Sequence, residues 1–510
     1  MPAPNIVLIM ADQLAPHFTS TYGHPVVKTP HMDAIAARGT RFDAAYCNAP
    51  LCAPSRFSFM SGQLVTNIAA YDNASEFPSA VPTFAHYLRM MGYRTCLSGK
   101  MHFVGPDQLH GFESRVTTDV YPSDYAWTPD WELPDERIDK WYHNMESVRE
   151  AGVGATTFQL AYDEEVAFAA KRQIFDYACK QAEPFCLVAS FIHPHDPYVA
   201  RKEWWDLYSS DDIDMPAHVL TRDEQDGFSK RLMDGIEASV IDVSEDEIRD
   251  ARHAYYANTS YFDSKVGELV QTLKEAEMLD NTIVIVTADH GDMLGERGLW
   301  YKMNFFEHSA RVPLVVAGPG VANRSLTNAC SLVDILPTMM DIASQDGTKK
   351  PALGQPIDGR SLWPALTGGD DTGDEAIGEY CAEMTSHPVF MIRRGPWKYI
   401  HCDADAPLMF NLEDDPAELT NLADVPKHAD RAGAFAEEVA ARWKSEDIRS
   451  DVIATQKARR AIYDAMNAGA MTSWDYNPPR DAAQEYVRNH MDWTVAADQT
   501  RFPPLTKGDG

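Results

Sequence analysis

Short apolar segments alternate with helical segments through the first two thirds of this 510-residue chain, and this alternation constrains its fold more than any other feature. Buried parallel strands are short, apolar and often β-branched. Five segments have that character, namely 6–10, 94–98, 185–191, 283–287 and 313–317. Helical segments at 83–91, 163–180 and 255–278 lie between them. Such alternation favours an α/β fold in which a large, mainly parallel central sheet is flanked by helices.

The character of the sequence changes after about residue 370. Two β-like runs, 377–383 and 389–401, are separated by a turn at 386–388, which predicts a smaller antiparallel sheet. Residues 446–510 form a tail whose aromatic residues favour packing on its own chain or on a neighbouring subunit. We therefore predict three parts, a catalytic domain (1–370), an α+β subdomain (371–445) and a C-terminal extension (446–510).

The net charge of −31 limits the partners that this chain can bind. An acidic surface repels nucleic acid and favours cationic or neutral partners, although solubility alone would also explain it. We expect no membrane segment, because no apolar run approaches the roughly 20 residues that span a bilayer. The apolar run 5–10 is followed closely by the acidic Asp12, so we interpret it as a first strand rather than a signal peptide. Without a secretion signal, the eight cysteines are expected to be reduced thiols in a cytoplasmic protein.

Polar residues able to bind ligands follow four of the predicted strands. In chain order they are Asp12 and Gln13, then Lys100 and His102, then His193 and His195, and finally Asp289 and His290. Taken singly, each could be a turn carboxylate, a loop residue or a surface amine. Ligands of open α/β sheets bind outside the carboxyl ends of the strands, where side chains from parallel strands converge. We therefore expect these residues to share one crevice.

The segment Cys52-Ala53-Pro54-Ser55-Arg56 gives the sharpest local signal. Its Pro and Ser suit the start of a helix, where free N–H groups and the helix dipole favour an anion. A cysteine placed there is expected to have a lowered pKa. For a cysteine alone, a buried structural role near a turn is the competing interpretation.

This segment resembles the signature of the type I sulfatases of the alkaline phosphatase superfamily, in which the cysteine is oxidised to formylglycine. The resemblance covers most of residues 4–425. Further matching motifs are 5–12, 281–292 with its Thr-Ala-Asp-His-Gly-Asp core, Trp300-Tyr301-Lys302, 311–314 and 410–422. It implies an alkaline phosphatase-like fold, and a formylglycine-generating enzyme as a partner for maturation.

The resemblance also implies roles for individual residues. Asp12, Gln13, Asp289, His290 and the formylglycine derived from Cys52 would bind a divalent metal. Gln13 stands where many relatives have a second Asp, and His290 where many have Asn. Oxygen ligands favour Ca²⁺, our first expectation, or Mg²⁺, whereas an imidazole ligand shifts the preference towards Mn²⁺. The sulfate oxygens would be held by Arg56, Lys100 and Lys302, while His102 and His195 would form the acid–base pair.

Within this family, the whole chain resembles the choline sulfatases, including the tail from about residue 470. The stretches that carry this are 71–73, Trp127, Glu383 and 489–493. A trimethylammonium group is recognised by aromatic faces and nearby carboxylates. Candidates are Trp127 and Trp493 as faces, Glu383 and Asp492 as counter-charges, and Asn73 as polar support. If the tail crosses to a neighbour, the active site requires a homo-oligomer, a dimer or a tetramer.

Two other functions fit the catalytic motifs. Phosphonate monoester and phosphodiester hydrolases of the same superfamily share the Asp-Gln and Asp-His variants of the core. A non-catalytic protein that holds a sulfated ligand would result if Cys52 were not converted. The complete set of catalytic residues argues against the second alternative.

Overall fold

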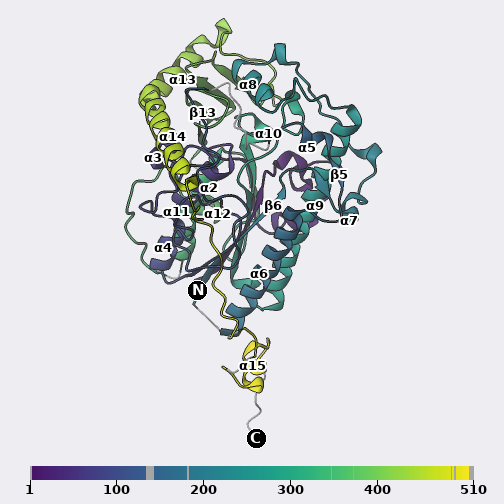
Figure 1. Cartoon of the computed structure of the whole chain (residues 1–510), viewed down its shortest axis with the longest axis vertical. Helices are drawn as coiled ribbons and strands as arrows, with labels where there is room; N and C mark the ends of the chain where they lie inside the picture. The colour runs from purple at the N-terminus through teal and green to yellow at the C-terminus, as the bar shows by residue number, and fades with distance from the viewer. Residues whose placement is uncertain are drawn as a thin grey trace.

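The computed structural model describes residues 3–133, 143–180, 183–345, 347–370, 373–483, 485–487 and 490–504. A nine-stranded sheet within these ranges runs through the middle of the molecule, in the order β10-β2-β9-β8-β1-β6-β3-β4, with β11 paired to β2 (Figure 1). Its strands are β1 (Asn5–Asp12), β2 (Thr40–Tyr46), β3 (Arg94–Gly99), β4 (Ser114–Arg115), β6 (Phe185–Pro194), β8 (Thr282–Ala288), β9 (Arg311–Ala317), β10 (Arg324–Leu326) and β11 (Cys330–Ser331).

The mainly parallel sheet predicted from the sequence is confirmed. β1 is central and pairs in parallel with β6 and β8, and β3 extends the parallel set beyond β6. One prediction was wrong. β9, which the apolar run 313–317 suggested to be a parallel strand, is antiparallel to both β8 and β2. A strand that is covered on both faces has the same composition in either direction, so its residues do not encode its direction.

Helices cover both faces of this sheet. α6 (Phe158–Lys180) and α9 (Glu245–Glu275) pack together on β6, on one face, while α2 (Cys52–Ser61), α4 (Phe84–Met90) and α11 (Ile335–Ala343) pack together on the other (Figure 1). Shorter helices are α1 (Pro30–Ala36), α3 (Val65–Ile68), α5 (Glu146–Arg149), α7 (Lys202–Trp205), α8 (Gly227–Gly235), α10 (Glu307–Ala310) and α12 (Trp363–Leu366). A further two-stranded pair joins β5 (Gly152–Val153) to β7 (Val199–Ala200). No described helix is long and apolar enough to cross a membrane.

The smaller antiparallel sheet is also present, in the order β12 (Glu375–Tyr380), β13 (Val389–Arg394), β14 (Trp397–Cys402) and β15 (Leu408–Asn411). The run 389–401 proves to be two strands, because Gly395 adopts a φ of 55° and turns the chain back on itself. α13 (Ala429–Arg442) covers this sheet. Just after it, Trp443 stacks on Phe390 with ring centroids 4.3 Å apart, so the subdomain has an apolar cluster of its own.

The C-terminal extension divides into two pieces. α14 (Ser445–Asn467) packs back on the catalytic part, where Arg459 makes a two-pronged ion pair with the buried Asp72, at 2.6 and 2.7 Å. The chain then runs down to α15 (Trp493–Thr500), which lies beside α6, far from α2 (Figure 1). Within the extension, α14 therefore contacts Asp72, which directly precedes Asn73. α15, with Trp493 at its start, does not lie there.

The Arg459–Asp72 pair gives a stability prediction. Arg459→Met would leave the Asp72 carboxylate, which is fully buried, without its cation. Breaking a buried pair in this way costs about 3–5 kcal/mol. We expect a clear fall in the apparent Tm measured by calorimetry. Lys457→Met is the matched control on the same helix, because its pair with Glu132 is half exposed and should contribute little. Equal Tm values for the two variants would contradict the prediction.

Candidate active site

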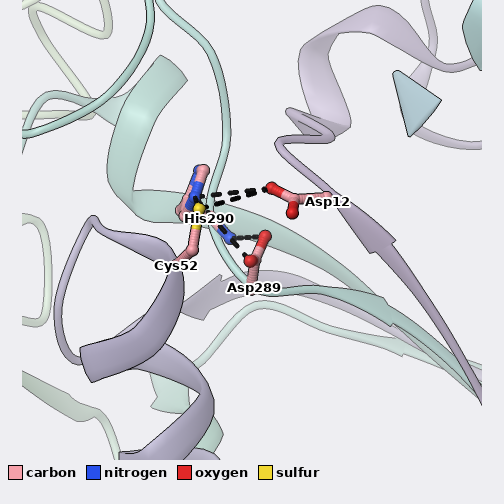
Figure 2. Close-up of side chains that lie close together, drawn as sticks. All are labelled: Asp12, Cys52, Asp289 and His290. Carbon is pink, nitrogen blue, oxygen red and sulfur yellow. Dashed lines mark hydrogen bonds and ion pairs between the residues drawn. The ribbon is translucent and has the colours of Figure 1, made fainter. Parts of the chain in front are cut away.

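The strand ends bring the predicted catalytic residues together, as expected. β1 ends at Asp12, β3 ends just before Lys100, β6 just before His195 and β8 just before Asp289. α2 adds Cys52 at its first turn, and all ten of its residues are buried. Figure 2 shows Asp12, Cys52, Asp289 and His290 pointing toward one another from these separate elements. Sequence positions up to 278 residues apart therefore form one cluster.

This cluster has the composition of a metal site. Asp12, Cys52, Asp289 and His290 each offer a ligand atom, and these four atoms lie within 4.8 Å of one another. Cys52 Sγ is 3.3 Å from His290 Nε2 and 3.7 Å from Asp12 Oδ1. Burial lowers the pKa of His290 to about 4, so the ring is neutral and can act as a ligand. Two carboxylates and an imidazole fit a divalent metal of the Ca²⁺, Mg²⁺ or Mn²⁺ class.

The expectation of a lowered pKa for Cys52 was wrong. Its side chain is fully buried, and burial together with the Asp12 carboxylate raises the pKa to about 11, although Lys100 and Lys302 act in the opposite direction. The thiol is therefore neutral at physiological pH and is poorly suited to be a nucleophile itself. Its backbone neighbour is fixed by Asn73, whose Oδ1 accepts a hydrogen bond from the Ala53 N–H at 3.0 Å.

Two buried cations surround the carboxylates. Arg56 Nε donates to Asp289 Oδ2 at 2.8 Å, and its Nη2 lies 3.3 Å from Asp12 Oδ2. Lys100 Nζ contacts the same Asp12 oxygen. Burial alone would raise the pKa of Asp12, but the neighbouring cations Lys100 and Arg56 outweigh it and hold the pKa well below its usual value. Asp12 is thus ionised, with Oδ1 facing Cys52 and His290.

The side-chain amide of Gln13 is locked in one orientation. Its Nε2 donates to Asp292 Oδ2 at 2.7 Å and to Asp196 Oδ1 at 3.2 Å, while its Oε1 accepts from Lys302 Nζ at 2.6 Å. Both amide hydrogens are used, so the oxygen must face the interior of the site. A carboxylate in place of this amide would meet the carboxylates of Asp196 and Asp292. The chain therefore presents a neutral amide oxygen at this position.

Lys302 also contacts His195. Its Nζ lies 2.8 Å from His195 Nε2, and His195 Nδ1 lies 2.6 Å from the carbonyl oxygen of Asp196. A protonated lysine can only donate, so Nε2 accepts and Nδ1 carries the hydrogen. Burial, followed by Lys302, lowers the pKa of His195 well below its usual value. The His195 ring is therefore neutral before substrate binds. His193 contacts Asp163 at 2.6 Å instead and stays outside the cluster.

His102 lies beside the cluster, next to aromatic rings. Its backbone has a φ of 59°, and neither ring nitrogen has a hydrogen-bond partner among the described residues. Burial and Lys100 lower its pKa to about 3, so the ring is a neutral base. The half-buried rings of Tyr121 and Trp127 lie 5.1 and 5.9 Å from it and 5.3 Å from each other. An aromatic surface therefore adjoins the catalytic cluster.

The remaining predicted substrate contacts divide into two groups. Glu383 is buried close to the catalytic cluster, and burial and Asp72 raise its pKa to about 7, against a smaller opposing effect of Lys302. Asp492 and Trp493 do not reach the cluster within one chain. Asp492 instead caps α15, and Trp493 is 72% exposed. Asn489, part of the same predicted stretch, lies outside the described residues.

Sequence reasoning missed Tyr121, Asp196 and Asp292. The two acidic residues could have been found from the sequence. Asp196 directly follows His195, and Asp292 lies two residues after His290, and both histidines were singled out. Tyr121 stands in a loop without a motif, and only the fold brings its ring to 4.2 Å from Lys100 Nζ.

Comparison with known proteins agrees with this arrangement of site residues. The profile "Sulfatase" matches residues 4–345, "N-sulphoglucosamine sulphohydrolase, C-terminal" matches 295–444, and "Choline sulfatase enzyme C terminal" matches 450–502. The chain is 46% identical over 508 residues to a choline-sulfatase of Rhizobium meliloti (strain 1021), with 98% of each chain covered. It is 29% identical to arylsulfatase K of Rattus norvegicus, covering 82% of this chain and 75% of the relative.

Among solved structures, a phosphonate monoester hydrolase of Agrobacterium radiobacter shares the fold, with a TM-score of 0.68 and 23% identity over 88% of this chain and 96% of that one. At this identity the likeness concerns the fold alone. The family profile, by contrast, spans the strand ends that carry Asp12, Lys100, His195 and Asp289, together with Cys52. This chain belongs to the sulfatase family.

Proposed function

We propose that this protein hydrolyses choline sulfate to choline and inorganic sulfate. One observation carries the assignment, the 46% identity to a choline-sulfatase along the whole chain, C-terminal extension included. The site agrees with it. An aromatic surface formed by Tyr121 and Trp127 lies beside the cluster that would bind sulfate. Glu383 and Asn73 are also close to it, so a cationic head group could be held next to the reacting ester.

The chemistry requires two groups beyond the encoded side chains. Formylglycine made from Cys52 would supply, as its hydrate, two hydroxyl groups on one carbon, one to attack sulfur and one to expel sulfate. A divalent metal held by Asp12, Gln13, Asp289 and His290 would neutralise charge on the sulfate; Ca²⁺ fits the oxygen donors, and Mn²⁺ the imidazole. A formylglycine-generating enzyme is the partner required for the conversion.

The chain's own residues supply the rest. Arg56 and Lys100 line the cluster and would hold sulfate oxygens while negative charge develops on them. The departing choline needs a proton. The Lys302–His195 pair, in which Lys302 Nζ contacts His195 Nε2, would supply it. The neutral His102, whose ring nitrogens have no hydrogen-bond partner among the described residues, could take a proton during the release of sulfate. In this proposal, His102 is the base, and the acid comes from the Lys302–His195 pair.

The substrate assignment is tested by comparing kcat/KM for choline sulfate, a neutral aryl sulfate and phenylphosphonate, with protein produced alongside a formylglycine-generating enzyme. We expect choline sulfate to be preferred although its alcohol is the poorer leaving group, because binding of the ammonium head lowers the barrier. A preference for phenylphosphonate would favour a phosphonate monoester hydrolase instead. A mass spectrum of the Cys52 peptide from the same sample establishes that conversion took place.

The C-terminal extension completes the proposal. α15, which Asp492 caps and Trp493 begins, lies far from α2 of its own chain (Figure 1), and Trp493 is largely exposed. We propose that they contact substrate in a neighbouring subunit of a homo-oligomer, a dimer or a tetramer.

Deleting residues 470–510 tests this idea. We expect a rise in KM for choline sulfate of about tenfold or more, since an aromatic and a charged contact would be lost. The KM for the aryl sulfate should change little. Light scattering should show a lower molecular mass, because the oligomer would dissociate. Full choline sulfate activity in a monomer would contradict the proposal, while leaving the catalytic assignments intact.

A further inference from the structure

A cavity of about 480 Å³ lies where the main sheet and its helices meet the smaller sheet. It is lined by residues from β2, α10, the start of β9, β13 and the loop after β15, and it shares no residue with the catalytic cluster. Its volume falls in the range of about 300–1,000 Å³ typical of small-molecule sites. Arg297, Arg311 and Arg393 all line it.

Each carboxylate in the lining already has a cationic partner. Glu307 and Glu418 share Lys398, at 2.6 and 2.7 Å. Asp43 pairs with Arg41 at 2.7 Å, and Glu296 pairs with Arg252 at 3.4 Å. None of these three cations is one of the lining arginines. The negative charge of the cavity wall is therefore compensated from outside the wall.

The three lining arginines have much weaker compensation. Neither Arg297 nor Arg393 forms an ion pair in the part of the chain that the structure describes, although each is only 8% exposed. Arg393 Nε donates to the Tyr46 hydroxyl, and Arg297 donates to the carbonyl oxygen of Glu418. Arg311 comes no closer than 3.8 Å to Glu307. Arg297 Nε, Arg311 Nε and Arg393 Nη1 have no hydrogen-bond partner among the described residues.

The charges around the cavity do not balance. The four lining carboxylates, together with Asp214, which pairs with Arg252 at 2.5 Å, face six cations, the three partners named above and the three arginines, which leaves an excess of one positive charge. The stacked rings of His17 and His308, 4.0 Å apart at the cavity wall, are kept neutral by burial and by neighbouring cations, which lower both pKa values. In a chain with a net charge of −31, such a positive cavity is an unusual local feature.

We propose that this cavity is a binding site for a small metabolite that carries an oxyanion group. Planar guanidinium groups match the oxygens of phosphate or sulfate, and the negative charge of such a group would offset the excess positive charge. The volume exceeds what a bare oxyanion needs, which favours a phosphate or sulfate ester over the free ion.

Calorimetric titration with inorganic phosphate and with glycerol 3-phosphate tests the site. Arg311→Met/Arg393→Met should weaken the binding of both probes at this site by about tenfold or more, because charge-assisted hydrogen bonds are lost. Arg394→Met is the matched control, since Arg394 follows on the same strand but pairs with Glu375 and Glu438. Tighter binding of glycerol 3-phosphate than of phosphate identifies an ester as the ligand, and equal binding identifies the free oxyanion.

Binding at the catalytic cluster would survive the double substitution, so unchanged affinity in that variant overturns the proposal. A second measurement does not depend on the folding of any variant. Crystals of the unaltered protein grown with selenate should show anomalous scattering between Arg311 and Arg393. A selenate peak at the catalytic cluster without one in this cavity would also overturn the proposal.

Discussion

Cys52→Ser is expected to abolish multiple turnover, with a fall in kcat on the order of 10³-fold or more, as for other essential catalytic groups. A serine hydroxyl can still attack sulfur, but its carbon carries no second hydroxyl group to expel the sulfate. The variant should therefore accumulate as a sulfated protein after at most one turnover. Intact-mass spectrometry after incubation with choline sulfate would detect the added SO₃ group.

The matched control is Cys179→Ser, at a partly exposed cysteine near the end of α6, which should keep full activity. Neither Cys52 nor Cys179 forms a disulfide, so neither substitution breaks one. Sustained turnover by Cys52→Ser would rule out the formylglycine mechanism while leaving the fold and the family unaffected.

Lys302→Met is expected to lower kcat for choline sulfate by about 10²–10⁴-fold, the usual contribution of a general acid. Lys302 donates to both Gln13 Oε1 and His195 Nε2, so its loss removes the proton destined for the departing alcohol. An aryl oxide leaves without much protonation. The same variant should therefore lose far less activity towards an aryl sulfate, and the ratio between the two substrates is the informative measurement.

Lys265→Met separates this role from the general effect of removing a buried ammonium group. Lys265 is 5% exposed and pairs with Glu164 and Glu268 on the α6–α9 side of the molecule. Its loss should affect both substrates equally. If Lys302→Met also lowered both rates by the same factor, Lys302 would act by holding sulfate and not by supplying a proton.

Much of the fold could be predicted because the strands near the site are continuous apolar runs. β1, β3, β6 and β8 all lie where the sequence placed them. β2 was missed, since its intermediate burial at Arg41 and Asp43 interrupts the apolar pattern. The turn at Gly395 was missed within an otherwise β-like run. Strand direction, as for β9, depends on connections that composition does not encode.

The catalytic cluster was predictable for a related reason. Asp12, Lys100, His195 and Asp289 follow strands directly, so locating the strands locates the residues. The pKa of Cys52 could not be predicted, because it depends on complete burial and on Asp12, 40 residues away. The position of the extension could not be predicted either. The Arg459–Asp72 pair spans 387 residues and has no local signature.

The complete burial of α2 has a consequence for the order of folding and modification of this protein. Cys52 has no exposed surface, and Arg56 and Ser55 of the same helix are tied to the Asp289 segment from inside the molecule. A modifying enzyme cannot bind this segment once the chain has folded and buried it. The proposed oxidation of Cys52 would therefore have to precede folding, on the nascent or unfolded chain. A molecule that folded first would keep its thiol, so under this proposal the active fraction would depend on the relative rates of folding and modification.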